Sequence, residues 1–315
     1  MPSIVTLTLN PSLDLAAEVD HVVPEEKLRC SAPVTQAGGG GLNVSRAIAR
    51  LGGHTAAVWT CGGPTGHRLG RLLEAEGIES VPVPIADDTR QNVSIYERAS
   101  TLQYRFGFPG ARVTEPELDA CIDALRRLGE PAYLVLSGSL PPGVDPAFYQ
   151  RVSCAVERAR VVVDTSGEAL RHAVRGRVFL LKPNLRELAE LVGEEVLDDR
   201  DIVRASRRII GDGHAEVVVT SLGAAGVMLV TADLVESIRS PTVPIRSKVG
   251  AGDSAVGGIV LALSRGLPLR RAVRFGVASG ASAVSTPGTD LCRRDQTEEL
   301  YERLVEDGRE NARIP

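Results

Sequence analysis

The chain has 315 residues, of which 43% are hydrophobic and 24% are charged, as in a folded globular protein. Its net charge of −4 argues against a nucleic-acid partner, since such partners usually require a basic surface. The five cysteines show no metal-ligand spacing, no apolar run reaches the ~20 residues of a membrane helix, and we see no signal peptide. We therefore expect a cytoplasmic protein that does not associate with membranes.

Strands and helices are expected to alternate along most of the chain. Apolar, β-branched runs predict strands at 3–9, 55–60, 79–84, 132–136, 160–163, 178–181, 216–220 and 226–230. Helical patterns follow at 44–51, 66–76, 114–128, 146–159, 255–263, 269–284 and 295–306. This rhythm predicts an α/β fold with a mostly parallel sheet.

Two regions depart from the rhythm, at about 15–30 and 90–108. Extended segments are predicted at 15–23, 27–30, 92–98 and 102–108, the last two joined by a hairpin turn. We expect them to form a small separate sheet, inserted as a lid into a single domain that spans 1–315. The lid also carries four cationic residues: Lys27, Arg29, Arg90 and Arg105. They either bind a phosphate-bearing substrate or are ordinary strand residues whose charges face solvent.

Small or polar residues follow several predicted strands. Because the carboxyl ends of parallel strands meet at one edge of a sheet, these loops should line a single ligand crevice. Asp14 and Ser139 stand in such loops, and the glycines 38–41 lead through Asn43 into a helix. Asp14 and Asn43 either cap their own turns or hold sugar hydroxyl groups.

The segment Gly250-Ala251-Gly252-Asp253 opens the predicted helix at 255–263. Small residues let backbone N–H groups approach a ligand, and a helix N-terminus attracts phosphate. Asp253 is either a carboxylate that stabilises the first turn of the helix or a general base beside a phosphate site.

Two further strand ends carry polar residues. Lys182, Asn184 and Glu187 follow the predicted strand 178–181, and the last two share one face of a helix. That pair can orient the water shell of Mg²⁺, or Glu187 can simply complement the helix dipole. The Gly-bearing turn at 221–226 follows the next strand. No Walker-type phosphate loop is present, and the single nearby G-x-G does not favour a Rossmann dinucleotide site.

These segments together resemble the PfkB, or ribokinase-like, sugar kinases. The resemblance covers about Ile4 to Leu304 and rests on four segments in the order typical of that family: Gly39-Gly40-Gly41-x-Asn43, Lys182-Pro183-Asn184-x-x-Glu187, Ser221-x-Gly223-x-x-Gly226 and Gly250-Ala251-Gly252-Asp253. Five more segments look like its 6-phosphofructokinase branch: 10–14, 24–30, 89–92, 103–106 and 137–143.

The resemblance implies a three-layer α/β/α sandwich with a β-sheet lid through which two copies form a homodimer. It implies ATP and Mg²⁺ as cofactors and the phosphorylation of fructose 6-phosphate at its 1-hydroxyl group. Asp253 would be the base and the amides of Gly250, Ala251 and Gly252 the anion hole. The sugar phosphate would be held by Asp14, Lys27, Arg29, Gly39, Asn43, Arg90, Arg105 and Ser139. The nucleotide would face Lys182, Asn184, Ser221, Gly223, Gly226 and Lys248, with Glu187 acting through Mg²⁺.

Some features depart from the family pattern or leave alternatives open. Residues 246–249 differ from many relatives, and Asp290 stands at a position where close relatives can carry a base; both regions border the monovalent-cation site of several relatives, so K⁺ dependence stays open. Tagatose 6-phosphate kinase and 1-phosphofructokinase activities are the nearest alternatives. A non-catalytic sugar-phosphate sensor is a different one, although it would have no use for a base at Asp253.

Overall fold

The computed structural model describes residues 3–286, 288 and 290–311. Within them, nine strands form a sheet in the order β13–β12–β11–β10–β9–β8–β1–β4–β5. Their bounds are β1 Ile4–Thr8, β4 Ala56–Cys61, β5 Glu79–Pro84, β8 Tyr133–Ser137, β9 Arg160–Asp164, β10 Leu180–Leu181, β11 Val217–Ser221, β12 Val227–Val230 and β13 Val235–Ile238. Neighbouring strands from β5 to β11 run parallel, and only β12 and β13 are antiparallel to their neighbours.

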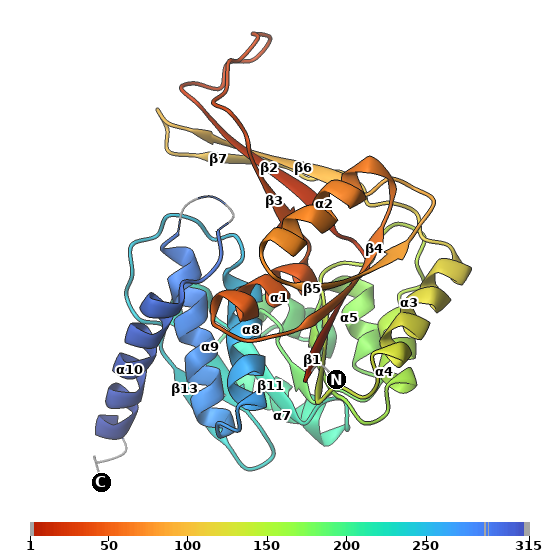
Figure 1. Ribbon diagram of the computed structural model, residues 1–315. Helices are drawn as coiled ribbons and strands as arrows, with labels where there is room; N and C mark the ends of the chain where they lie inside the picture. Colours follow the sequence, from red (N-terminus) through yellow and green to blue (C-terminus); the bar gives the residue numbers. More distant parts are fainter. Residues whose placement is uncertain (1–2, 287, 289, 312–315) are drawn as a thin grey trace.

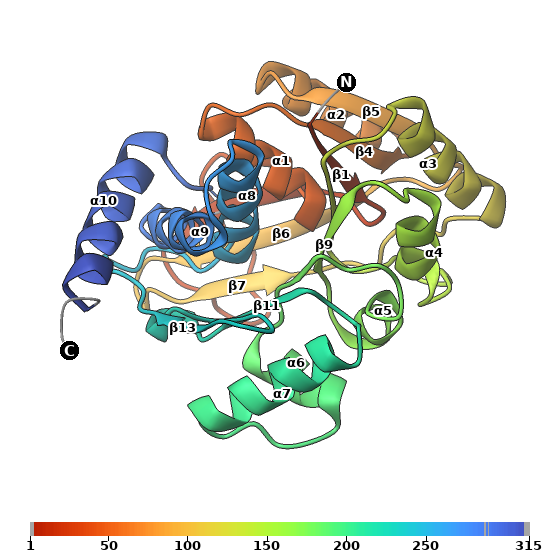
Figure 2. The ribbon, with the colours of Figure 1, turned by 90° about the horizontal axis from the view of Figure 1, so that it is seen from below.

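Helices cover both faces of this sheet, which confirms the expected three-layer α/β/α fold (Figures 1 and 2). One face packs against α1 (Gly40–Arg50), α2 (Gly63–Ala75), α8 (Ala251–Ser264) and α9 (Leu269–Val284), with α10 (Arg294–Asn311) outside α9. The opposite face packs against α3 (Glu115–Arg127), α4 (Phe148–Ala155), α5 (Gly167–Ala173), α6 (Leu185–Val192) and α7 (Asp199–Gly211). The strands are apolar on both faces because each face is buried under helices.

The lid is a second sheet of four strands in the order β3–β2–β6–β7. Its strands are β2 (Ser12–Val19), β3 (Val34–Gly38), β6 (Arg90–Glu97) and β7 (Gln103–Phe106). The first pair lies between β1 and α1 in the chain and the second pair between β5 and α3. Figure 1 shows the lid projecting above the body of the molecule.

One lid strand was predicted at the wrong place. Residues 27–30 were expected to be extended, but the strand that pairs with β2 is Val34–Gly38. Residues 20–33 instead form a long connection at the far end of the lid, although its Ser31 N–H still donates to the Glu18 carbonyl. The four residues 27–30 include no β-branched or aromatic side chain, whereas Val34 and Thr35 are both β-branched and favour a strand.

Three elements were not predicted: α5, α7 and the edge strand β13. The sequence of α7 is rich in arginine, yet its Ile202, Ala205 and Ile209 are buried at helical spacing and Asp198 caps its start. No helix in the described residues is both long enough and apolar enough to span a bilayer. The sequence also predicts a loop at 286–290, of which Pro287 and Thr289 lie outside the described residues.

Candidate active site

The helix α8 begins at Ala251, four residues earlier than expected, so the small residues belong to its cap and first turn. Gly250 is the N-cap, with φ of 74°, and a Cβ atom there would lie 2.4 Å from Leu291 Cδ2. This position therefore requires glycine. Gly252 is exposed, so the N–H groups at this helix start are accessible to a ligand.

Asp253 lies in the first turn of α8 and faces α1. Its Oδ2 atom accepts a hydrogen bond from Asn43 Nδ2 at 3.0 Å. Burial, together with the negative charge of Asp164, raises the pKa of Asp253 to about 7, while Asn43, Lys182 and Arg46 oppose the shift. A carboxylate with such a pKa can accept a proton near neutral pH.

Lys182 connects this helix start to the sheet. It follows β10, is buried, and its Nζ atom lies 3.0 Å from Asp164 Oδ1 at the end of β9. Burial lowers the pKa of Lys182, but Asp164, Asp253 and Glu187 outweigh burial and raise it overall. A Cβ atom built on Gly252 would lie 3.7 Å from Nζ, so a permanent positive charge stands beside the N-terminus of α8.

Asp14 was expected in a loop, but it lies within the lid strand β2, because the strand already begins at Ser12. Its Oδ1 atom accepts hydrogen bonds from Ser12 Oγ at 2.7 Å and from Asn92 Nδ2 at 3.0 Å. A Cβ atom on Gly38 would lie 2.3 Å from Asp14 Oδ2, so a residue without a side chain is needed on the neighbouring strand beside this carboxylate. The exposed Ser139 Oγ accepts from Asn10 Nδ2 at 3.0 Å, and Gly39 is the N-cap of α1.

Arg90 lies at the body end of the lid, where it pairs in register with Ser12. It donates to the carbonyl oxygens of Phe108 and Asn10, and its buried Nε has no hydrogen-bond partner among the described residues. Burial lowers the pKa of Arg90, and Asp14 opposes that shift.

The other lid cations lie far from Arg90 within one protomer. Lys27 and Arg29 are exposed and belong to the connection beyond Val19, seven strand residues from Arg90 in the β2–β6 register, which is roughly 23 Å. Arg105 is exposed on β7 opposite Ser94. The expected single cationic set is therefore not assembled by one copy of the chain.

The segment after β10 forms a helix cap. The Asn184 side chain accepts from the Glu187 N–H, and Glu187 Oε2 accepts from the Asn184 N–H, both at 2.9 Å. Among the described residues, Glu187 Oε1 has no hydrogen-bond partner. Burial and the charge of Asp164 raise the pKa of Glu187, whereas the Asn184 N–H and Lys182 lower it. Groups of three acidic, cysteine or histidine side chains that could hold a metal do not occur in the described residues.

The turn after β11 lies beside that cap, since Asn184 forms a parallel bridge with Ser221. Gly223 starts a 3₁₀ turn with φ of 62° and is exposed. Gly226 has φ of 105°, and a Cβ atom there would lie 2.1 Å from the Ile238 carbonyl oxygen. The glycine at 226 is thus required by packing against β13, whereas the one at 223 faces open space.

The segment that departs from the family pattern lies next to α8. Lys248 is exposed. Ser247 is buried, and the Ser247 Oγ accepts a hydrogen bond from the Val249 N–H. Asp290 accepts from Arg50 NH2 at 3.0 Å and from Gln36 Nε2 at 3.3 Å, so its carboxylate already has cationic and amide partners.

A shallow hollow of about 580 Å³ lies elsewhere, between α7 and the antiparallel strands β12 and β13. Arg200, Arg204 and Arg207 line it together with Met228 and Val235. It contains none of the expected site residues, so it is separate from the crevice at the strand ends.

Sequence reasoning missed two charged residues of the crevice. Asp164 ends β9 at the same sheet edge as the expected residues. Its place directly after the apolar run Val161–Val163 could have predicted that position from the sequence. Arg46 lies within α1, is fully buried, and donates to the Asn43 Oδ1 atom at 3.3 Å. Nothing in the local sequence distinguishes Arg46 from an exposed helical arginine.

The chain was compared with protein families and with known proteins. The family model for pfkB family carbohydrate kinases matches residues 7–296. The chain is 44% identical to the ATP-dependent 6-phosphofructokinase isozyme 2 of Mycobacterium tuberculosis, over 97% of this chain and 91% of the relative. It is also 44% identical to the protein of the same name from Escherichia coli, over 96% and 99%. A 1-phosphofructokinase of Bacillus subtilis is 32% identical, over 96% and 97%.

Solved structures of relatives have the same fold. Phosphofructokinase-2 from Escherichia coli in complex with potassium has a TM-score of 0.93 at 43% identity, covering 97% of this chain and 100% of that one. The tetrameric inhibited form of the same enzyme has a TM-score of 0.92 at 42% identity, with the same coverage. Ribokinase from Arabidopsis thaliana, complexed with ribose and ATP, has a TM-score of 0.74 at 19% identity, covers 96% and 99%, and supports the ribokinase-like fold alone.

Proposed function

The chain belongs to the pfkB family of carbohydrate kinases, and we propose that it transfers the terminal phosphoryl group of ATP to the 1-hydroxyl group of fructose 6-phosphate. The relatives at 44% identity are ATP-dependent 6-phosphofructokinases, which favours this substrate over that of the less similar 1-phosphofructokinases. The observation that carries the proposal is the pairing of Asp253 with the accessible N-terminus of α8.

In this proposal, Asp253 takes the proton of the acceptor hydroxyl group. Oδ2 is held by Asn43, and no hydrogen bond to Oδ1 is found among the described residues, so Oδ1 is available to the hydroxyl. The bond from the hydroxyl oxygen to phosphorus forms as the bond from phosphorus to the leaving oxygen of ADP breaks. The amides of Gly250, Ala251 and Gly252 and the ammonium group of Lys182 would stabilise the charge on the migrating phosphoryl oxygens.

The residues at the strand ends fit a nucleotide phosphate chain with Mg²⁺. The backbone N–H groups at Gly252 and the buried ammonium group of Lys182 are neighbouring hydrogen-bond donors, which suits the binding of an anion. The free Oε1 atom of Glu187 suits Mg²⁺, which takes few protein oxygens and otherwise binds water and phosphate. When bound there, Mg²⁺ would neutralise negative charge on the nucleotide phosphates. Asn184, Ser221, Gly223, Gly226 and Lys248 would line the nucleotide side.

The sugar phosphate would lie between the lid and the body. Asp14, Asn43, Gly39 and Ser139 would contact its hydroxyl groups, since they surround the crevice at the lid base. The unpaired Nε–H group of Arg90 supports a role in binding the existing phosphate. Lys27, Arg29 and Arg105 could add positive charge only from elsewhere on the lid or from a second copy.

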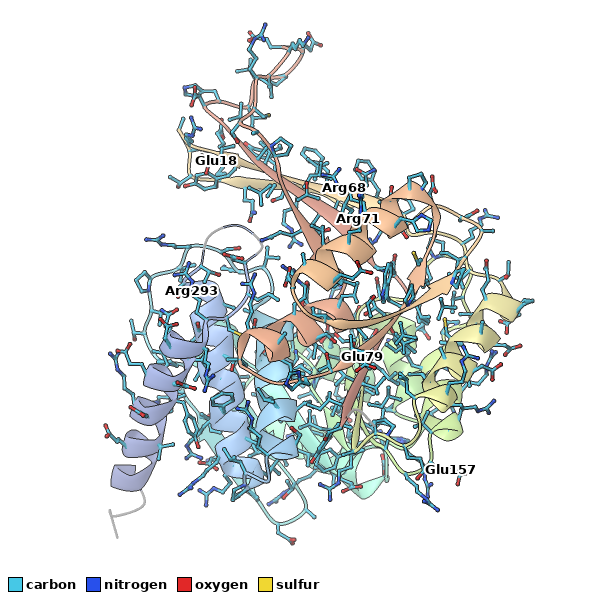
Figure 3. All side chains as sticks on the ribbon, viewed as in Figure 1. Glu18, Arg68, Arg71, Glu79, Glu157 and Arg293 are labelled. Carbon is cyan, nitrogen blue, oxygen red and sulfur yellow. The ribbon has the colours of Figure 1, made fainter. Side chains whose placement is uncertain are left out.

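We propose that this second copy docks on the lid. Alternation along the paired strands puts one apolar set on a single face, which we call the apolar lid face: Leu15, Ala17, Val93, Ile95, Tyr104 and Phe106. In Figure 3, Arg68 and Arg71 mark α2 beneath the base of the lid, whereas Glu18 lies on its outer part. Phe106, on the edge strand β7, is 52% exposed, so this face is partly uncovered in one protomer.

The function is tested by measuring ADP release with Mg·ATP across a panel of fructose 6-phosphate, tagatose 6-phosphate and fructose 1-phosphate. We expect kcat/KM to be highest for fructose 6-phosphate, and a preference for either other sugar would contradict the assignment. Absence of ADP release with every sugar would favour a sensor. Repeating the assay with K⁺ replaced by tetramethylammonium measures dependence on a monovalent cation.

The role of Asp253 is tested with Asp253→Asn, which keeps the shape of the side chain but cannot accept the proton. We expect kcat to fall by about 10²–10⁴-fold, the usual contribution of a general base. The matched control is Asp123→Asn on α3, where the aspartate is exposed and pairs only with Arg126. Full activity of Asp253→Asn would contradict the proposal that Asp253 is the general base.

A further inference from the structure

Arg46 is an unusual residue for the middle of a helix. Its side chain is 1% exposed, although arginine is rarely buried without a specific reason. Its NH2 atom lies 2.9 Å from Glu76 Oε1, its Nε donates to both Glu76 oxygens, and its NH1 donates to the Ala37 carbonyl at 2.6 Å. Burying an ion pair generally stabilises a fold little or not at all, so stability alone does not explain it.

The remaining contact of Arg46 points to the crevice. NH1 also donates to Asn43 Oδ1 at 3.3 Å, one helical turn away, while Asn43 Nδ2 donates to Asp253 Oδ2 at 3.0 Å. A guanidinium group has donors and no acceptor, so the amide oxygen of Asn43 must face it. The opposite amide orientation would set NH₂ against the guanidinium group and oxygen against the carboxylate, and both hydrogen bonds would be lost.

We propose that Arg46, anchored by Glu76, is a positioning residue that fixes Asn43 as a donor to Asp253 and so holds the base oriented and ionised. The inference rests on the proposed function, in which Asp253 takes a proton. The charged groups around Asp253 come from three elements: Asp164 at the end of β9, Lys182 after β10 and Arg46 on α1. Asp164 disfavours the carboxylate form, whereas Lys182, Arg46 and the Asn43 amide favour it.

The test is the pH profile of kcat/KM for Arg46→Met, which removes the charge and the donors but keeps a long side chain. Losing them should raise the pKa of Asp253, so the acidic limb should move to higher pH by about half a unit to one unit, and kcat should fall about tenfold. The matched control is Arg274→Met, which breaks the similarly buried pair between Arg274 and Glu236 away from the crevice. Arg274→Met should lower the melting temperature without moving the limb.

A double-mutant cycle separates positioning from a purely structural role. Because Arg46 acts through Asn43, Arg46→Met should change the profile little further in an Asn43→Ala background. An undiminished effect there, or a native profile for the single variant, would overturn the inference. If Arg46→Met does not fold, Arg46→Lys provides the same test, since it keeps the buried charge beside Glu76 but loses the guanidinium fork that reaches both Glu76 and Asn43. We expect a smaller shift in the same direction, and an unchanged limb would overturn the inference.

Failure of the proposed function gives a different result. Full activity of Asp253→Asn would show that Asp253 is not the base, and both the proposed mechanism and the role of Arg46 would then be wrong. An inactive Asp253→Asn variant together with a native pH profile for Arg46→Met would contradict only the role of Arg46 and leave the proposed function in place.

Discussion

Asp253 and Glu187 are both acidic residues in the first turn of a helix, and both could have been helix-stabilising carboxylates. Glu187 does have that structural role, because it closes a reciprocal cap with Asn184. Asp253 does not cap its helix, since its one hydrogen bond crosses to α1. The contrast supports a chemical role for Asp253, whereas any role of Glu187 with Mg²⁺ must use the oxygen that the cap leaves free.

The pKa of Asp253 predicts how activity depends on pH. Because the proposed base acts only when deprotonated, kcat/KM should be half-maximal near pH 7, level off about one unit above it and fall about tenfold per unit well below it. The measurement is the rate at low fructose 6-phosphate from pH 5.5 to 9. A limb near pH 6 would instead indicate the second ionisation of the sugar phosphate, which is close to that value.

At the scale of elements, two glycines of the turn after β11 have different reasons to be glycine. Both have positive φ, but only Gly226 is pressed against β13. Gly223→Ala should therefore cost about 1 kcal/mol of unfolding free energy through the backbone conformation alone. Gly226→Ala should cost at least about twice as much, because the added methyl group meets the Ile238 carbonyl oxygen.

Urea unfolding of the two variants checks this order, with Gly211→Ala as the control. Gly211 ends α7, and nothing lies within 4 Å of an added Cβ, so that variant should be neutral or slightly more stable. Equal losses for Gly223→Ala and Gly226→Ala would contradict the packing explanation.

The sequence could predict the alternating α/β architecture because most strands are continuous apolar runs between Gly- or Pro-bearing loops. It could also bring Lys182 and the helix start at Asp253 to one sheet edge, since parallel strands share that edge, but it did not place Asp14 on a lid strand. It could not predict the hydrogen bond from Asn43 to Asp253, which joins residues 210 positions apart. It also could not place Lys27 and Arg29, because their distance from Arg90 depends on the register of β2 with β6.

At the scale of the whole molecule, the apolar lid face predicts self-association. Phe106→Glu puts a charge on the exposed side chain of the apolar lid face, so it should shift the protein from dimer toward monomer at micromolar concentration. Light scattering after size-exclusion chromatography measures the mass. Gln103→Glu on the same strand but the opposite face is the control and should leave the mass unchanged.

The assembly prediction has two contradicting outcomes. A native protein that is monomeric at every concentration would refute it directly. An unchanged mass for Phe106→Glu would show that any assembly uses another surface, since relatives include a tetrameric form whose contacts need not be on the lid.

The pairing of β2 with β6 joins the two ends of the lid. The same two strands carry the paired Asp14 and Asn92 and, from the next residues on, the half-buried apolar side chains of the apolar lid face. Sugar binding and subunit association then use the same pair of strands, and any effect of one on the equilibrium of the other is reciprocal in free energy. Dilution should weaken the affinity for the sugar, and saturation with the sugar should tighten the oligomer by the same factor.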